Sequence, residues 1–551
     1  MAANPFFFLS FLSLLSFLFI LPTQCQTEPS PSMSGGNWVL LHSSIGISAM
    51  HMQLLRNDKV IMFDRTDFGP SNLSLPTGHC RSDPNDVALT NDCTAHSLLY
   101  DIPSNSFRPL LVQTDTWCSS GSVLPNGTLV QIGGFNDGER VVRTFSPCTD
   151  DQCDWTELPY YLSVRRWYSS NQILPDGRII VVGGRKAFTY EFYPKSSSAP
   201  VNYPLRFLKE TSDGIEENNL YPFLHLLPDG HLFIFANTRS ILLDYVKNQV
   251  LREFPEIPGG HKRNYPSTGS SVLLPLFLSQ SPEAEVMVCG GAPPGAFYLT
   301  QQGVYVGASS TCGRLKVTDP NPVWVMEKMP MGRVMPDMLL LPTGDVLILN
   351  GAANGTAGWE DAINPVLNPV LYHPYERDST RRFSVLEASP IPRLYHSAAV
   401  VIPDGRILVG GSNPHRLYNF TGVLYPTELS LEAFSPHYLA TEYSDFRPRV
   451  VAAGPNVSYH DTFTVAFELS VYRSEQGISV TLLAPSFTTH SFAMNQRLLV
   501  LNVVSLIQLS TSAYQASVEG PTDAAVAPPG YYLVFVVHVG IPSHGVWVKV
   551  G

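Results

Sequence analysis

The stretch Leu174-Pro-Asp-Gly-Arg-Ile-Ile-Val-Val-Gly-Gly184 shows the pattern that organises most of this chain of 551 residues. Its proline presets φ for the first position of a turn, its glycine permits a positive φ later in the turn, and the β-branched run that follows favours a strand. The pattern recurs with small changes from Leu124, Leu227, Leu341 and Ile402. Each copy therefore predicts a strand, a tight turn and a returning strand.

Two weaker copies complete the series. The copy at 274–291 carries an insertion, and the copy at 55–63 lacks the proline. Successive copies start roughly 47 to 69 residues apart, a spacing typical of kelch-type blades with four strands each. Seven copies therefore predict a seven-bladed kelch-type β-propeller in an all-β chain. The alternative is a set of unrelated hairpins in one sandwich. So many widely spaced copies are hard to place in a single sandwich.

A second domain is predicted after the repeats end near Phe434. Beyond this point the chain reads as alternating strands, for example Thr462-Phe-Thr-Val-Ala-Phe-Glu-Leu469. A region of about 118 residues with this pattern suits an immunoglobulin-like β-sandwich. The predicted parts are a signal peptide at 1–25, the propeller at 26–433 and the immunoglobulin-like domain at 434–551.

The N-terminus predicts secretion. Residues 6–21 are almost wholly apolar but too few to span a membrane comfortably, and Thr23 and Cys25 fit the −3 and −1 positions of a cleavage before Gln26. An uncleaved anchor is the alternative, and no later stretch is apolar enough to span. The net charge of −11 argues against a nucleic-acid partner. Sequons that fit a glycosylated product begin at Asn72, Asn126, Asn354, Asn419 and Asn456.

Cysteine arithmetic singles out one residue. Cleavage after Cys25 leaves seven cysteines, and an odd number in an oxidising compartment leaves one unpaired. Other connectivities remain open, and a free Cys118 could simply be a buried thiol. Three local pairings would leave Cys118 free: Cys80 with Cys93, Cys148 with Cys153, and Cys289 with Cys312.

Three reactive side chains share one position in the repeat. Cys118, Tyr168 and His396 each stand seven residues before the proline of their turn. If the strand before the turn is the innermost of its blade, a radial fold brings them to one mouth of the central channel. Tyr395 would face away from His396 in a regular strand, so an irregular turn is expected there. Taken singly, each could be an ordinary packing residue.

The other blades carry different residues at the same position of the repeat. These are Tyr221, Thr268 and Met335, which could line the pocket or serve as spacers. His51 lies near the corresponding position of the first copy, and its role is undecided.

Four motifs stand in order along the chain: Trp117-Cys-Ser-Ser-Gly121, Arg166-Trp-Tyr-Ser-Ser170, Arg393-Leu-Tyr-His-Ser397 and Thr488-Thr-His-Ser491. They resemble the site motifs of the copper radical oxidases, the family of galactose oxidase and glyoxal oxidase, and are most similar to its plant glyoxal oxidase-like branch. The resemblance implies a thioether bond between Cys118 and Tyr168, which together form a tyrosyl radical cofactor. It also implies one copper ion, with Tyr395 as axial ligand and base. The full implied ligand set is Tyr168, Tyr395, His396 and His490.

The resemblance implies a secreted oxidase that converts small aldehydes of the glyoxal or methylglyoxal type, as hydrates, to carboxylic acids and reduces O₂ to H₂O₂. A Cu(II) ion takes up one electron, so this two-electron reaction needs a second store, and a thioether-substituted phenolate can be that store. The expected setting is the cell wall or apoplast. A monomer is expected there, with a peroxidase that consumes H₂O₂.

Two departures bear on the substrate. Galactose oxidase stacks a tryptophan over its crosslinked tyrosine, and by simple counting that place reads Gly184-Arg-Lys186 here. The sugar-binding module that precedes its propeller is also absent. Both departures favour small aldehydes over galactose. The alternative functions are a galactose oxidase-like alcohol oxidase acting on cell-wall sugars or primary alcohols, and a non-catalytic propeller that binds glycans or protein.

Overall fold

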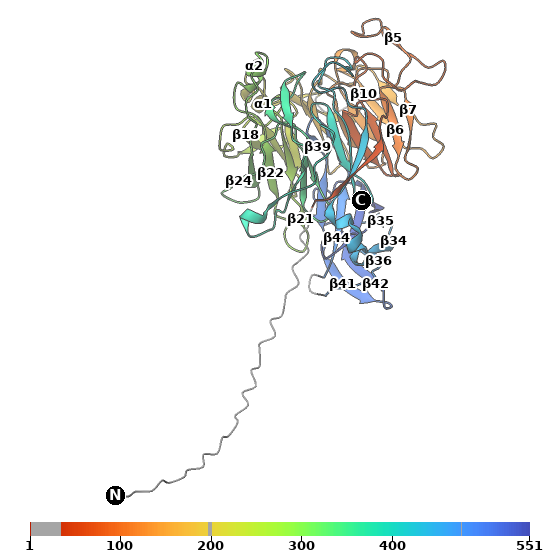
Figure 1. Ribbon diagram of the computed structural model, residues 1–551, viewed down its shortest axis with the longest axis vertical. Helices are drawn as coiled ribbons and strands as arrows, with labels where there is room; N and C mark the ends of the chain where they lie inside the picture. Colours follow the sequence, from red (N-terminus) through yellow and green to blue (C-terminus); the bar gives the residue numbers. More distant parts are fainter. Residues whose placement is uncertain (2–34, 197–200, 475–476) are drawn as a thin grey trace. The chain divides into compact units, whose positions relative to one another are not determined.

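The repeated hairpins form seven antiparallel blades of four strands each (Figure 1), six as separate four-stranded sheets and the first as part of a six-stranded sheet. The computed structural model describes residue 1 and residues 35–196, 201–474 and 477–551, so the predicted signal peptide lies outside the described residues. In each of the seven blades, the first strand precedes the predicted turn and lies innermost. These inner strands are β2 (His51–Leu55), β8 (Ser120–Val123), β12 (Ser169–Ile173), β16 (Phe223–Leu226), β20 (Gly269–Leu273), β25 (Asp337–Leu340) and β31 (Ser397–Val401).

Three further antiparallel strands extend each sheet outward. The first four sheets continue with β3 (Lys59–Phe63), β6 (Ser97–Asp101) and β7 (Ser106–Leu110); β9 (Leu129–Ile132), β10 (Val142–Phe145) and β11 (Thr156–Leu158); β13 (Ile179–Gly183), β14 (Thr189–Tyr193) and β15 (Tyr203–Pro204); and β17 (Leu232–Ala236), β18 (Arg239–Asp244) and β19 (Gln249–Glu253). The others continue with β22 (Glu285–Gly290), β23 (Thr311–Lys316) and β24 (Trp324–Lys328); β26 (Val346–Leu349), β29 (Val370–Tyr372) and β30 (Phe383–Val385); and β32 (Ile407–Gly411), β33 (Leu431–Ser435) and β1 (Asn37–His42).

The ring closes by pairing distant parts of the chain. β1 pairs antiparallel with β33, from Asn37 opposite Ser435 to His42 opposite Leu431. From β8 to β31 the inner strands also contact one another in order, and β31 contacts β2. The predicted all-β fold with a seven-bladed propeller is therefore confirmed, and its last blade is completed by the strand nearest the N-terminus.

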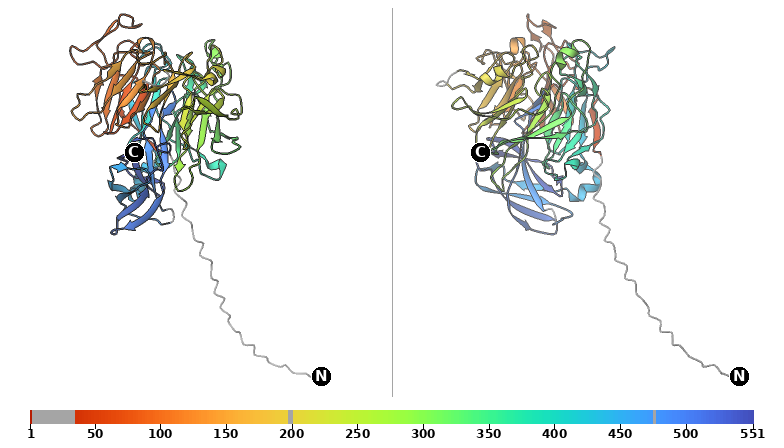
Figure 2. Two further views of the ribbon diagram at one scale, coloured as in Figure 1. Left: turned by 180° about the vertical axis from the view of Figure 1, so that it is seen from behind. Right: turned by 90° about the vertical axis from the view of Figure 1, so that its left-hand side faces the viewer.

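The C-terminal domain is a two-sheet sandwich, drawn in blue in Figure 2. One sheet contains β34 (Arg449–Ala453), β36 (Thr462–Glu468), β42 (Ala513–Glu519) and β41 (Val503–Gln508). The other contains β40 (Arg497–Val500), β37 (Ile478–Ala484), β43 (Gly530–His538), β44 (Ile541–Pro542), β45 (Val546–Val550) and β35 (Asn456–Val457). A short strand from the insertion in the fifth blade, β21 (Leu276–Phe277), pairs parallel with β40. The insertion thereby fastens the propeller to the sandwich.

A hairpin of the C-terminal domain enters the propeller. Its strands are β38 (Phe487–Thr489) and β39 (Phe492–Met494), and β38 pairs with the inner strand β2 of the first blade. β39 contacts the inner strands β12, β16, β20 and β25. Gly121 makes room for this hairpin, because a β-carbon there would lie 2.4 Å from the Phe487 ring. The tip of the hairpin consequently lies among the inner strands of several blades.

The remaining elements are short. They include the helices α1 (Arg206–Glu210) and α2 (Ala296–Thr300) and the strand pairs β4 (Arg81–Ser82) with β5 (Asn91–Asp92) and β27 (Ala352–Gly355) with β28 (Ala362–Pro365). None of the helices in the described part of the chain has the length and apolar character needed to cross a membrane.

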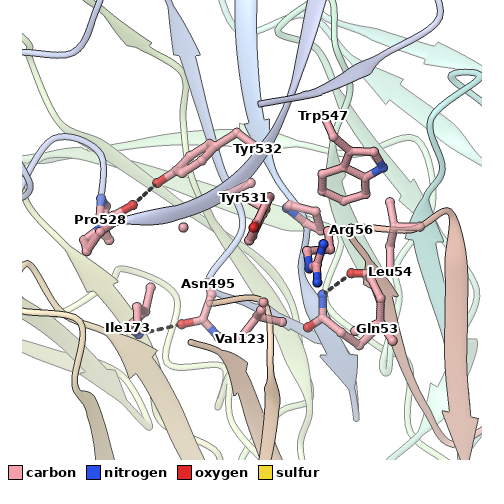
Figure 3. Close-up of a pocket in the computed structure, with 16 residues that line it drawn as sticks. Gln53, Leu54, Arg56, Val123, Ile173, Asn495, Pro528, Tyr531, Tyr532 and Trp547 are labelled. Atoms are coloured by element: carbon pink, nitrogen blue, oxygen red, sulfur yellow. Dashed lines mark hydrogen bonds between the residues drawn. The ribbon is translucent and has the colours of Figure 1, made fainter. Parts of the chain in front are cut away.

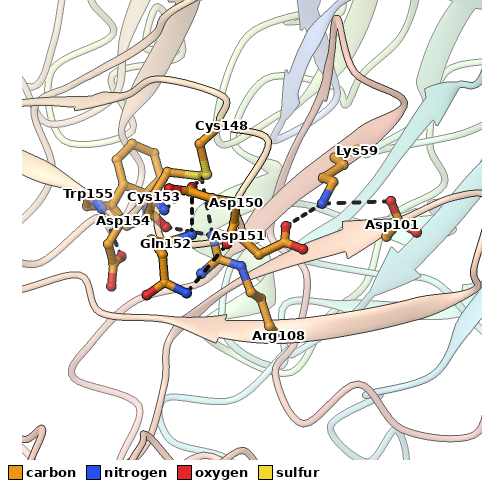
Figure 4. The surroundings of a disulfide bond; sticks show 10 residues. All are labelled: Lys59, Asp101, Arg108, Cys148, Asp150, Asp151, Gln152, Cys153, Asp154 and Trp155. Atoms are coloured by element: carbon orange, nitrogen blue, oxygen red, sulfur yellow. Dashed lines mark hydrogen bonds and ion pairs between the residues drawn. A yellow bond between two sulfur atoms is a disulfide. The ribbon is translucent and has the colours of Figure 1, made fainter.

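The three predicted disulfides are confirmed, and within the described residues Cys118 is the free cysteine. Figure 4 shows the Cys148–Cys153 loop of the second blade beside the first blade. Lys59 binds Asp151 of this loop at 2.5 Å, and Arg108 donates to the Cys153 carbonyl at 2.6 Å. The small disulfide loop therefore helps to join neighbouring blades.

A cavity of about 50 Å³ lies where the first three blades meet the sandwich (Figure 3). Asn495 Oδ1 accepts a hydrogen bond from the Ile173 N–H at 2.7 Å, and the Arg56 guanidinium lies 5.2 Å from the centre of the Tyr531 ring. None of the predicted site residues lines this cavity. It therefore belongs to the junction between the domains.

A buried ion pair holds the segment before β31. Arg393 Nη2 lies 2.7 Å from Glu432 Oε2, and each side chain is only 2% exposed. Arg393 also donates to the Gly411 carbonyl at 2.8 Å. The pair ties the segment that carries Tyr395 and His396 to the neighbouring strands of its own blade.

Glu432→Ala should lower the free energy of unfolding by about 3 to 5 kcal/mol, because the buried guanidinium of Arg393 loses its counter-ion. The matched control is the exposed pair Arg449–Glu468, where Glu468→Ala should cost about 1 kcal/mol or less. Urea unfolding followed by tryptophan fluorescence measures both. Similar losses in the two variants would show that the buried pair has no special role.

Candidate metal centre

Six residues of the predicted register share a left-handed backbone conformation. Residues with a β-carbon rarely adopt a positive φ, so the surrounding structure has to hold them there. Main-chain hydrogen bonds between blades do so: the Tyr168 N–H donates to the Cys118 carbonyl at 2.9 Å, and the Tyr221 N–H donates to the Tyr168 carbonyl at 3.0 Å. The φ angles lie between 25° and 65° for Cys118, Tyr168, Tyr221, Thr268, Met335 and His396.

His490 comes from the tip of the β38–β39 hairpin. Thr489 pairs with Phe492, so His490 and Ser491 form a two-residue turn, with φ of 44° and 68°. Positive φ at both positions is the signature of a type I′ turn, which usually selects asparagine or glycine. A histidine is held in this conformation because both strands of the hairpin are buried among the blades. The turn therefore places the imidazole of His490 beside the residues that share the predicted position in the repeat.

The structure brings the five predicted site residues together. The Cys118 Sγ lies 3.1 Å from His490 Nε2, and the ligand atoms of Cys118, His396 and His490 all lie within 4.8 Å of one another. The ring centres of Tyr395 and His396 are 3.7 Å apart, and those of His396 and His490 are 5.0 Å apart. β31 begins only at Ser397, so Tyr395 and His396 precede the regular strand and reach the same cluster.

Both imidazoles are prepared to bind a metal. His396 Nδ1 lies 3.2 Å from the Asn413 carbonyl, and His490 Nδ1 lies 2.7 Å from Thr489 Oγ1. His396 Nε2 is buried and has no hydrogen-bond partner among the described residues. Burial lowers the pKa of both histidines well below the usual value. Neutral rings with Nδ1 anchored can present Nε2 to a metal, which is the arrangement found at metal sites, and the Nε2 of His490 faces the Cys118 sulfur.

The two site tyrosines are joined by a third that the sequence patterns did not identify. Tyr168 donates to the Tyr265 hydroxyl at 3.1 Å, and the Tyr265 and Tyr395 hydroxyls are 3.0 Å apart. Burial raises the pKa of Tyr168 and of Tyr395 well above the usual value. Burial also raises the pKa of the Cys118 thiol, although hydrogen bonds with Tyr168 and Tyr395 oppose that rise. Without a metal, the cluster is therefore uncharged at neutral pH.

The other register residues support the cluster. Thr268 and Met335 line a cavity of about 10 Å³ beside Tyr395, His396 and His490, which is roughly the space of one water molecule. The Tyr221 hydroxyl donates to the Ser119 carbonyl at 2.8 Å. His51, undecided from the sequence, stacks on Phe63 and lies 3.2 Å from Ser119 Oγ. Burial lowers the pKa of His51 to about 3.

Tryptophans do stand next to the Tyr168 ring, although they are not at Gly184-Arg-Lys186. The Trp167 ring centre lies 4.8 Å from that of Tyr168 at an interplanar angle of 36°. Trp117 lies 4.9 Å from Trp167, and the Arg185 guanidinium lies 5.2 Å from the Trp167 ring. Both tryptophans belong to the motifs themselves, each directly before a register residue. The tryptophan next to Tyr168 is therefore the residue directly before it in the sequence.

Comparisons with known proteins agree with this geometry. A family model described as "Glyoxal oxidase N-terminus" matches residues 50–438, and one described as "Galactose oxidase-like, Early set domain" matches residues 447–550. The chain is 46% identical to "Aldehyde oxidase GLOX" of Vitis pseudoreticulata, over 93% of this chain and 97% of that protein. It is 45% identical to "Aldehyde oxidase GLOX1" of Arabidopsis thaliana, over 94% of this chain and 84% of that protein.

A solved structure has the same fold. It is titled "Novel fungal alcohol oxidase with catalytic diversity among the AA5 family, in complex with copper", and it aligns with a TM-score of 0.70 at 18% identity. The alignment covers 94% of this chain and all of that one. At this identity the likeness concerns the architecture of both domains.

Copper(II) binding at pH 5.5 should release about two protons, one each from Tyr168 and Tyr395, because the histidines are already neutral. Imidazoles with the usual pKa of about 6.5 would be largely protonated at this pH and would bring the total close to four. Calorimetry in buffers of different ionisation enthalpy counts the protons. The titration uses an anaerobic Cys118→Ser variant, so that crosslink formation adds none.

The control is Tyr395→Phe in the same background, which should release about one proton fewer. A release near four at pH 5.5 would mean that the buried histidines titrate as exposed ones do. An unchanged count in the Tyr395→Phe variant would remove Tyr395 from the proposed set of ligands.

Proposed function

Since the chain belongs to the glyoxal oxidase family, we propose that it is a copper radical oxidase that converts small aldehydes, as their hydrates, to carboxylic acids and reduces O₂ to H₂O₂. The observation that carries the proposal is the buried cluster of one free thiol, two site tyrosines and two neutral histidines, one of which has an orphaned Nε2. The names of the plant relatives support the aldehyde as the substrate class.

The donor set of the cluster suits copper. Imidazole nitrogens and phenolate oxygens are ligands that Cu(II) prefers, and His396, His490, Tyr168 and Tyr395 supply them. Bound copper would supply a one-electron acceptor and an open position for an oxygen ligand. The buried surroundings exclude bulk water from these four side chains, since each is at most 6% exposed.

Cys118 and Tyr168 supply the second redox site. Formation of a thioether breaks the S–H bond of Cys118 and a ring C–H bond of Tyr168, forms one C–S bond and removes two hydrogen atoms, which O₂ takes up. The sulfur substituent makes the phenolate easier to oxidise. Oxidation of an aldehyde hydrate to an acid releases two electrons and two protons, and Tyr168 can accept one of those electrons.

Tyr395 is proposed as the base. Its phenolate oxygen can accept a proton from bound substrate, and the Tyr265 hydroxyl lies 3.0 Å from it. The two protons and two electrons removed from the substrate then equal those needed to reduce O₂ to H₂O₂.

The features of the chain support an extracellular setting. Six of its seven described cysteines form three disulfides, which persist in oxidising compartments. Three of the sequon asparagines, Asn72, Asn126 and Asn456, are exposed. We infer a secreted, glycosylated monomer of the plant cell wall or apoplast, whose H₂O₂ a peroxidase there consumes.

Peptide mass spectrometry tests the cofactor. After aerobic copper loading, reduction and digestion, the peptides with Cys118 and Tyr168 should stay joined and weigh two hydrogens less than their sum. The Cys148 and Cys153 peptides serve as the internal control, because reduction releases an ordinary disulfide. In Cys118→Ser the Tyr168 peptide should appear alone. A Cys118 that alkylates freely after verified copper loading would instead favour a non-catalytic binding propeller.

Oxidase assays test the chemistry. H₂O₂ release should be fast with glyoxal and methylglyoxal and slow with galactose or simple primary alcohols. Tyr395→Phe should lower kcat by about 10² to 10⁴, the usual effect of removing a general base. Copper content and crosslink yield are measured in the same samples, so that a lost metal is not mistaken for a lost base. A preference for galactose would point to the alcohol oxidase alternative.

A further inference from the structure

The proposed radical residue is out of reach of solution. The Tyr168 side chain is 3% exposed, and its ring lies beneath those of Trp167 and Tyr265. A radical on Tyr168 nevertheless requires that one electron leave the ring. An oxidant too large to enter the buried cluster therefore needs a path through the protein.

A row of indole rings leads from Tyr168 to the surface. The ring centres of Tyr168 and Trp167 are 4.8 Å apart, and those of Trp167 and Trp117 are 4.9 Å apart. Trp117 stacks on Trp359 at 5.4 Å with an interplanar angle of 16°. Trp167 is partly exposed, Trp117 is 6% exposed, and the outermost ring, Trp359, is the most exposed of the three at 38%. Each ring thus touches the next, and the last ring meets water.

The outer end of the row is held in place. Trp359 lies between β27 and β28, and the following residue anchors the segment: the Glu360 N–H donates to the Pro414 carbonyl at 2.8 Å. Glu360 Oε1 also lies 2.9 Å from His415 Nδ1. The stacking of Trp359 on Trp117 is therefore supported by contacts of the main chain and of a neighbouring side chain.

We propose that Trp359, Trp117 and Trp167 form an electron path through which an outer-sphere one-electron oxidant at the surface converts Tyr168 to its radical. The inference rests on the proposed copper radical function. One electron leaves the Tyr168 phenolate and one oxidant molecule is reduced. No bond forms or breaks, and no proton moves, because the phenolate has already lost its proton on binding copper.

The surroundings of the row suit electron transfer without proton transfer. The indole nitrogens of Trp117 and Trp167 are buried and have no hydrogen-bond partner among the described residues. An oxidised indole ring therefore has no neighbouring group there to accept its N–H proton. The Arg65 guanidinium lies 3.5 Å from the Trp117 ring and would oppose a positive charge there. Arg65 is ion-paired with Asp67, which offsets this effect. The positive charge therefore resides on Trp117 only briefly, and the radical forms on Tyr168.

Stopped-flow oxidation of copper-loaded, crosslinked protein by ferricyanide tests the path. Radical formation, followed by optical absorbance and by loss of the copper(II) spin signal, should be at least about tenfold slower in Trp359→Phe, because phenylalanine is much harder to oxidise than tryptophan. Trp359→Tyr should stay within about threefold of the wild type, since tyrosine can also be oxidised. The final radical yield should be equal in all variants, because Tyr168 sets the equilibrium.

Trp38→Phe is the matched control, since this partly exposed tryptophan packs against Phe434, away from the row. It should leave the rate unchanged. A wild-type rate in Trp359→Phe would overturn the electron path while leaving the oxidase proposal intact. Failure of crosslinked, copper-loaded wild type to form any radical would instead overturn the proposed function.

Discussion

Main-chain hydrogen bonds between neighbouring blades are the interaction on which the site depends. The Tyr168 N–H donates to the Cys118 carbonyl while both residues hold a positive φ. That conformation costs of order 1 kcal/mol or more at each non-glycine position. Hydrogen bonds between blades and burial of these residues hold the conformation. The strained conformation also turns the side chains of successive blades toward one centre.

The second domain contributes one residue that the propeller alone lacks. Of the four proposed copper ligands, the propeller supplies Tyr168, Tyr395 and His396. The β38–β39 hairpin supplies the other, and its pairing with β2 makes it a part of the first blade. Conversely, the strand β21 of the propeller pairs with β40 of the sandwich. Assembly of the site consequently requires both domains.

The sequence was most informative where the fold repeats. The turn pattern predicts the blades, and its register predicts that Cys118, Tyr168 and His396 meet, because equivalent positions of a radial fold share one mouth. Local spacing suggested the three disulfides but left other connectivities open, and the structure decides between them. Tyr265 could not be predicted in this way, since it lies three residues before the register position Thr268, in a loop without a repeated pattern. Trp117 and Trp167 stood in the motifs, yet their stacking depends on blade geometry that spacing does not encode.

Charge explains why this buried centre suits a divalent ion. Without a metal, the proposed ligands are two neutral histidines and two tyrosines whose pKa values are raised by burial, so the pocket holds no net charge. A dipositive ion alone would be costly in such surroundings. Loss of one proton from each tyrosine adds two negative charges and restores neutrality. The same desolvation that keeps Tyr168 and Tyr395 protonated in the empty pocket therefore favours their ionisation together, once a copper ion enters.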